Sequence, residues 1–115
     1  MRRGQLVLFA AGLLGFGAAA CRTPTPTVMV DGYALNADHW TSVKEDLSRR
    51  ASFELNCPLT DLEFTVLKDG QGVPGVFDDW PSQVGVRGCD RQVLYLLVVD
   101  RTGWTWVTQS TAQVK

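Results

Sequence analysis

The chain has 115 residues, a length typical of one domain. Hydrophobic residues make up 45% of it and charged residues 20%, a balance that excludes a chain disordered throughout. The first twenty residues carry two arginines and no acidic residue, whereas the rest carries nine basic and twelve acidic residues. Nucleic acid is therefore not an expected partner, because proteins that bind it carry a basic excess.

The N-terminus has the layout of an export signal. Two arginines near the start are followed by an uncharged apolar run over residues 6–16, and three alanines stand directly before Cys21. The apolar stretch of residues 6–20 is shorter than the roughly 20 residues that a membrane-spanning helix needs. We therefore expect a signal peptide over residues 1–20, and a permanent transmembrane anchor is the weaker interpretation.

The segment Ala18-Ala19-Ala20-Cys21 resembles the lipobox of bacterial lipoproteins. In that family the cysteine receives a diacylglycerol, the chain is cut just before it, and the new amine is acylated. The resemblance implies that Cys21 is lipidated and anchors the protein to a membrane of the cell envelope. Arg22 is not the aspartate that family rules associate with the inner membrane, so the outer membrane is the expected location. Ala18 departs from the preferred leucine, and the alanines also fit ordinary signal peptidase, so a soluble secreted protein is the alternative.

Three cysteines are an odd number for an exported protein. Lipidation of Cys21 leaves an even pair, and an oxidising envelope favours a disulfide between Cys57 and Cys89. The chain-entropy model assigns a loop of about 32 residues roughly 3.7 kcal/mol of stabilisation. Two thiols and His39 are too few ligands for a metal site at these spacings, so no metal or cofactor is expected. A Cys/His nucleophilic pair lacks a supporting local motif.

Residues 21–36 are expected to tether the lipid to the folded part. Threonine and proline alternate at their start, a pattern that favours extended chain and blocks helix formation. The apolar residues further along either add an edge strand or lie on the domain. These are Val28, Met29, Val30, Tyr33 and Leu35.

One helix is predicted from Thr41 or Ser42, because Ser42 and Glu45 fit a capping box. Its apolar residues recur at steps of three and four, which places them on one face. They are Trp40, Val43, Leu47 and Ala51. The alternation over residues 53–57 indicates either the exit from the helix or a short strand.

Strands fill the rest of the chain. The expected elements are a strand over 62–67 with Leu62, Phe64 and Val66 inward, a loop over 71–83, a short strand over 84–86, a central strand over 92–99, a turn over 100–103 and a return strand over 104–108. The central strand is apolar on both faces, which predicts that both faces are covered. Residues 37–110 therefore predict an α+β domain, with one helix packed on a small antiparallel sheet of three to four strands, one disulfide and a polar tail over 111–115.

The mature part is similar to small envelope lipoproteins of uncharacterised role. The similarity extends from Thr41 to Gln109 and is carried by Cys57-Pro58, by residues 85–89 and by Tyr95. It implies no activity.

Aromatic residues are the most informative remaining feature for function. Trp40 lies on the helical stripe and is assigned to the core. Exposed rings would suit glycan stacking or a protein partner, and simple burial is the alternative. The candidates are Phe77, Trp80, Trp104 and Trp106. His39 is expected in a loop, and no G-x-S-x-G elbow accompanies it.

Three functions follow from these features. The first is a non-enzymatic, lipid-anchored envelope protein that binds a partner protein or stabilises an assembly. The second is a carbohydrate- or peptidoglycan-binding module, or a small inhibitor of a wall hydrolase, that uses the aromatic candidates. The third is a hydrolase built on His39 and an acid, which the sequence supports least.

Overall fold

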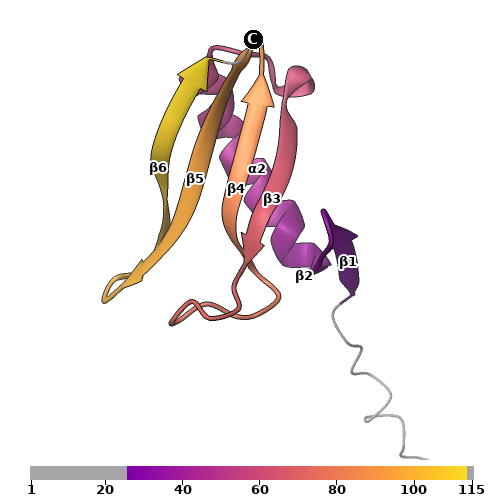
Figure 1. Cartoon of the computed structure of the whole chain (residues 1–115), viewed down its shortest axis with the longest axis vertical. Helices are drawn as coiled ribbons and strands as arrows, with labels where there is room; N and C mark the ends of the chain where they lie inside the picture. Colours follow the sequence, from indigo (N-terminus) through magenta and orange to yellow (C-terminus); the bar gives the residue numbers. More distant parts are fainter. Residues whose placement is uncertain (1–25, 114–115) are drawn as a thin grey trace, which may run out of the picture.

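The computed structural model describes residues 26–113 (Figure 1). The predicted signal peptide, Cys21 and residues 114–115 lie outside the described residues. The elements in chain order are β1 (Thr27–Val30), β2 (Tyr33–Asn36), α2 (Ala37–Leu55), the 3-10 helix η2 (Leu59–Asp61), β3 (Glu63–Asp69), β4 (Pro81–Gly88), β5 (Arg91–Asp100) and β6 (Gly103–Gln113). Strands β1 and β2 form a two-stranded sheet, and β3 to β6 form a four-stranded sheet in sequence order.

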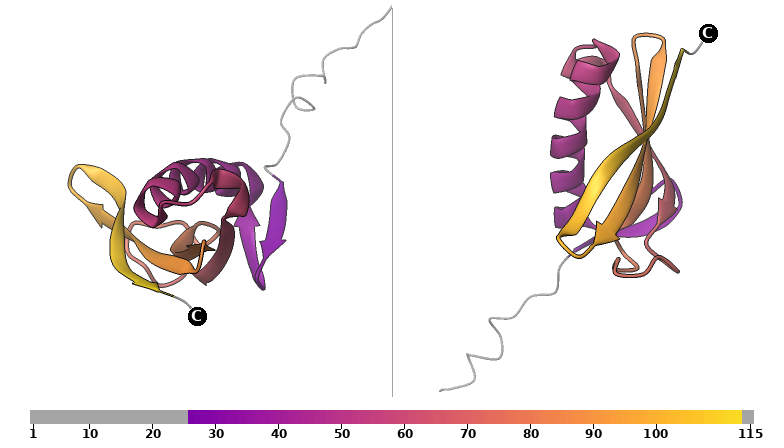
Figure 2. Two further views of the ribbon diagram at one scale, coloured as in Figure 1. Left: turned by 90° about the horizontal axis from the view of Figure 1, so that it is seen from above. Right: turned by 90° about the vertical axis from the view of Figure 1, so that its left-hand side faces the viewer.

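The α+β class, the single long helix on an antiparallel sheet and the disulfide are confirmed, but the described part of the chain has six strands in two sheets. Every neighbouring pair of strands is antiparallel. Figure 2 shows α2 lying across one face of the twisted four-stranded sheet. The additional sheet comes from residues 27–36, where the sequence suggested at most one edge strand.

The helix begins at Ala37, so the predicted start at Thr41 or Ser42 is wrong. Asn36 is its N-cap: the side-chain oxygen accepts a hydrogen bond from the backbone N–H of His39 at 2.9 Å. Asparagine is among the best residues at this position because it satisfies an amide that the first turn leaves free. Strand β2 therefore runs directly into the helix, and His39 belongs to its first turn instead of a loop.

The core lies between α2 and the sheet. The predicted stripe of the helix is buried, and Leu55 extends it by one turn. From the sheet, the buried side chains are Val66, Val84, Val86, Val93, Tyr95, Leu97 and Trp106. Leu35 of the hairpin is completely buried and joins this core, which fixes the hairpin to the domain. Burial of each large aliphatic side chain contributes about 1.5–3 kcal/mol.

The other face of β5 is not covered by any element of the described residues, so the predicted two-sided burial of this strand is wrong. Leu94 and Leu96 are half-buried there, and Val98 is exposed. One helix can cover only one face of the sheet, and antiparallel sheets tolerate a solvated second face. Apolar residues on both faces of a strand therefore did not indicate a second covering layer.

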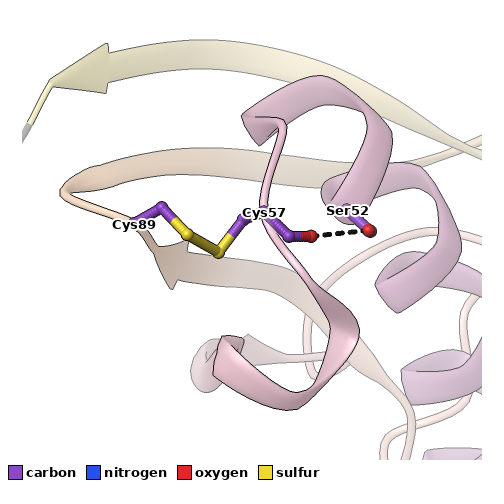
Figure 3. The surroundings of a disulfide bond; sticks show 3 residues. All are labelled: Ser52, Cys57 and Cys89. Carbon is purple, nitrogen blue, oxygen red and sulfur yellow. Dashed lines mark hydrogen bonds between the residues drawn. A yellow bond between two sulfur atoms is a disulfide. The ribbon is translucent and has the colours of Figure 1, made fainter.

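The predicted disulfide joins Cys57, just after α2, to Cys89 in the turn between β4 and β5 (Figure 3). The two Cα atoms are 5.7 Å apart, within the usual range for a disulfide. The Ser52 hydroxyl donates a hydrogen bond of 2.6 Å to the Cys57 carbonyl and so fixes the exit from the helix. A Cβ atom at Gly88 would lie 2.9 Å from the Cys57 sulfur, so this close approach requires glycine.

The outward backbone groups of both edge strands are partly occupied. On β3, the Val66 N–H donates to the Asp31 carboxylate at 2.7 Å, and the Tyr33 hydroxyl donates to the Leu67 carbonyl at 2.9 Å. On β6, the Arg50 guanidinium donates to the Trp106 carbonyl. Such contacts limit the pairing of an edge strand with another chain.

Candidate functional site

Four rings from three separate segments meet at one end of the domain. We call His39, Phe77, Trp80 and Trp104 the aromatic cluster. Trp80 is its centre: the His39 ring stacks on it with centroids 4.0 Å apart and planes 12° apart. Phe77 and Trp104 meet Trp80 edge to face, at centroid distances of 5.0 and 5.3 Å. Both stacked and edge-to-face pairs are favourable arrangements of aromatic rings.

Helix α2, the loop between β3 and β4, and the start of β6 each contribute to the cluster. His39 is placed by the Asn36 cap at the start of α2. Phe77 and Trp80 lie in the loop, and the Trp80 N–H donates to the Phe77 carbonyl at 3.1 Å. The Asn36 N–H donates to the Asp79 carbonyl at 2.9 Å, which joins the loop to the helix start. Figure 1 shows the loop, the β5–β6 turn and this end of α2 together at the lower end of the domain. We call this the aromatic end.

Gly70 allows the loop to hold Phe77 in place. A Cβ atom at position 70 would lie 2.0 Å from the Phe77 carbonyl oxygen, far inside any allowed contact. The loop is closed locally by the Val73 N–H, which donates to the Gly70 carbonyl at 3.1 Å. The backbone conformation that presents Phe77 therefore depends on the absence of a side chain at residue 70.

The cluster combines covered and exposed rings. Phe77 is 65% exposed and Trp104 is 49% exposed, whereas Trp80 between them is partly buried. Trp106 was grouped with them from the sequence, but it is only 8% exposed and belongs to the core under α2. The structure thus brings together three of the four aromatic candidates and adds His39, whose place in an aromatic cluster is not predicted from the sequence.

The surroundings of His39 favour a role in ring packing over a role in proton transfer. Burial lowers its pKa below the ordinary value, and the negative charge of Asp79 offsets part of that shift. The imidazole is therefore predominantly neutral at pH 7 and stacks on Trp80 as an uncharged ring. Within residues 26–113, the imidazole makes no hydrogen bond to another side chain that would orient it as a base. The two cysteines of the described chain are joined in the disulfide, so neither offers His39 a thiol.

The segments around the cluster are acidic. Residues 36–39, 68–80 and 100–104 contain five aspartates and only Lys68 and Arg101 as cations. The Asp100 carboxylate accepts hydrogen bonds from the Thr102 side chain and backbone, which lower its pKa. The aromatic end therefore combines exposed rings with net negative charge at neutral pH.

The surface also has two hollows, the second of which reaches the aromatic cluster at Trp104. A groove of about 310 Å³ lies on the open face of the sheet at Gly85, and its lining includes Leu67, Leu94, Arg87 and Gln92. A shallower one of about 380 Å³ lies between α2 and β6 and extends from Trp106 to Trp104. The carboxylate of Asp61 lies near both disulfide sulfurs, but sulfurs joined in a disulfide do not offer the thiolates that bind a metal.

No protein-family model, curated protein or solved structure matches this chain. In the part of the chain that the structure describes, no helix is both long and apolar enough to cross a membrane. The features that bear on function are therefore the aromatic cluster and the sequence that precedes the domain.

Proposed function

We propose that this protein is an exported, lipid-anchored component of the cell envelope, and that its domain is a non-enzymatic binding module. Cys21 carries the lipid, and the aromatic cluster is the binding surface. The observation that carries the binding role is the exposure of Phe77 and Trp104, at 65% and 49%, on a support of packed rings. Exposed aromatic side chains with restricted motion are typical of binding hot spots, because little entropy is lost on contact.

The anchoring role is supported by the sequence before the domain. The apolar run and the three alanines before Cys21 fit export and lipidation, and the disulfide suits an oxidising compartment. The described domain contains two disulfide-bonded cysteines, which leaves Cys21 as the remaining thiol of the chain.

Glycan binding is the alternative that the geometry favours less. A sugar platform would be served best by neighbouring rings that lie in one plane, whereas Phe77 and Trp104 are inclined to the plane of Trp80 between them by 68° and 67°. His39 already covers one face of Trp80. The cluster offers an uneven, ridged patch, which suits a broad surface better than a flat sugar ring.

The anchoring role is tested by the mass and location of the mature chain. Intact-mass measurement of the membrane fraction should find a chain that starts at triacylated Cys21. The Cys21→Ser variant should lose both the lipid mass and the membrane association. A wild-type product without lipid mass would show that the anchoring proposal is wrong.

The binding role is tested by photo-crosslinking at two exposed phenylalanine positions. Phe53 is 87% exposed at the far end of α2 and provides a matched control for Phe77. Benzoylphenylalanine at position 77 of the membrane-bound protein should form an adduct with an envelope component, and the same group at position 53 should not. Equal adducts at both positions would contradict a binding role for the cluster.

A further inference from the structure

The chain enters the domain beside the aromatic cluster. The Pro26 carbonyl accepts a hydrogen bond of 2.9 Å from the Ala37 N–H at the first residue of α2. His39 follows two residues later in the same helical turn. Figure 1 shows β1 and the start of α2 at the same end of the domain as the β3–β4 loop and the β5–β6 turn. The segment that leads back to Cys21 therefore leaves from the aromatic end.

The connection between Cys21 and the domain is short. Pro26 lies five residues after Cys21, and five residues span at most about 18 Å when fully extended. A lipid on Cys21 places that residue at the bilayer surface, in headgroups roughly 5–8 Å deep on each side. The aromatic end is then held within reach of the headgroups, whereas α2, with 19 residues, extends roughly 28 Å away from its start.

We propose that the partner of the aromatic cluster is the lipid bilayer that holds Cys21, and that Phe77 and Trp104 insert into its headgroup region. This inference rests on the proposed lipidation of Cys21. Tryptophan concentrates at the membrane–water interface because its ring is apolar and its N–H is polar. The tether supplies a high local concentration, so a contact too weak for a free protein is sufficient to orient an anchored one.

The charge of the aromatic end selects the type of lipid. Five aspartates against Lys68 and Arg101 give the surrounding segments a net charge of −3, and His39 is predominantly neutral at pH 7. Anionic headgroups would repel this surface, and salt would screen the repulsion. The docked state is therefore expected on zwitterionic lipid and weakened by phosphatidylglycerol.

Docking would also orient the rest of the molecule. Phe53 lies fourteen residues after His39 on α2, about 21 Å further along the helix axis. Figure 1 shows the end of α2 and the β4–β5 turn, which the Cys57–Cys89 disulfide joins, at the end of the domain opposite the β3–β4 loop. Phe53 and the disulfide are expected to remain in water while the aromatic end contacts the bilayer, which makes Phe53 the matched control for Phe77.

The test uses the full lipidated protein, purified from membranes and reconstituted into phosphatidylcholine vesicles with or without bromine on the acyl chains near the headgroups. Bromine quenches tryptophan emission at short range. Trp40 and Trp106 are 5% and 8% exposed and provide an unquenched background. We expect quenching in wild type, a loss of the larger part of it in Trp104→Phe, a smaller loss in Phe77→Ala and none in Phe53→Ala.

Each other outcome overturns a defined part of the scheme. A protein that floats with the vesicles but shows no quenching retains the anchor and refutes docking. A purified chain without lipid that does not float refutes the proposed function itself. A different result is that soluble peptidoglycan fragments change the tryptophan emission of wild type but not that of Trp104→Phe. If bromolipid then has no effect on the emission, the cluster is a glycan site and docking to the bilayer is refuted. Stronger quenching in phosphatidylglycerol than in phosphatidylcholine refutes the lipid preference.

Discussion

The two ends of the domain are built by different means. At the far end, a covalent bond joins the exit of α2 to the β4–β5 turn, and glycine at position 88 allows the chains to touch. At the aromatic end, α2, the β3–β4 loop and β6 are joined by ring packing and by one backbone hydrogen bond, from the Asn36 N–H at the helix N-cap to the Asp79 carbonyl of the loop. Figure 2 shows the two ends separated by the length of the helix.

The end of the domain that contributes most to stability is therefore not the end that exposes the aromatic cluster. A disulfide stabilises the folded state without presenting any side chain to a partner, since it acts mainly on the unfolded chain. Rings packed on rings contribute less stability but leave Phe77 and Trp104 exposed and fixed. A small domain with a covalent constraint at one end can therefore expose apolar surface at the other and remain folded.

The largest expected effect comes from removal of the disulfide. The double variant Cys57→Ser with Cys89→Ser should lose about 3.7 kcal/mol of unfolding free energy, because the loop of roughly 32 residues is no longer closed in the unfolded chain. Urea unfolding followed by far-ultraviolet circular dichroism measures this loss, and a reductant added to wild type should reproduce it. An unchanged urea midpoint would show that the far end does not depend on the bond.

The second-largest loss of unfolding free energy is expected from a polar contact in the same half of the molecule. The hydroxyl of buried Tyr95 donates to the Glu54 carboxylate at 2.7 Å, and the Arg50 guanidinium lies over the Tyr95 ring. Tyr95→Phe removes a hydrogen bond to a charged group and should cost about 1.5–3 kcal/mol at pH 7. Urea unfolding of the two proteins measures the difference.

The same pair also predicts a pH dependence. Burial, the hydrogen bond to Glu54 and its negative charge raise the pKa of Tyr95 far above the ordinary value, against a smaller opposite effect of Arg50. Above about pH 10 the unfolded chain loses this proton while the folded chain keeps it. The contribution of the Tyr95 proton to the unfolding free energy is therefore fully present below about pH 10. Above that pH it falls by about 1.4 kcal/mol for each unit by which the pH rises. Tyr95→Phe should lack this component, and equal slopes in the two proteins would contradict it.

The far half was more predictable from sequence than the aromatic end. The disulfide followed from cysteine parity, and the helical stripe followed from its spacing, because both signals lie in residue types and short periods. The predicted start of the helix is wrong because Ser42 and Glu45 fit a capping box locally, whereas Asn36, at the end of the β1–β2 hairpin, is the N-cap in the structure. No pattern in Ser42 and Glu45 alone reveals that choice.

The cluster could not be predicted because its contacts are long-range. His39 stacks on Trp80, 41 residues away, and approaches Trp104, 65 residues away. The period-two alternation of a strand puts Trp104 and Trp106 on the same side of β6, and both line one groove. It could not reveal that the helix covers Trp106 and leaves Trp104 half exposed.

The substitution Gly70→Ala should disturb the aromatic end without changing any aromatic residue. The methyl group of Gly70→Ala would collide with the Phe77 carbonyl, so the loop must shift, at a cost of about 1–3 kcal/mol. Near-ultraviolet circular dichroism should lose the signal of the packed rings. Gly85→Ala is the control, because its new carbon would meet the Leu67 side chain at 3.7 Å and the Thr65 carbonyl oxygen at 4.0 Å, both ordinary contact distances. Equal spectra for Gly70→Ala and wild type would mean that the loop does not depend on this approach.

The smallest effect concerns the charge of His39, the ring that stacks on Trp80 in the cluster. Burial is the larger influence on His39 and lowers its pKa, whereas Asp79 raises it. The folded state therefore disfavours protonation, so the stability contributed by His39 is present above about pH 6.5 and falls as acidification charges the unfolded chain first. Asp79→Asn should lower the pKa further, because the desolvation remains while the opposing charge is removed. An NMR titration of the imidazole ring protons, in folded protein and in urea, measures both shifts. A folded pKa at or above the unfolded value would mean that the ring is solvated, and that the stacking on Trp80 does not hold the cluster in the way proposed for docking.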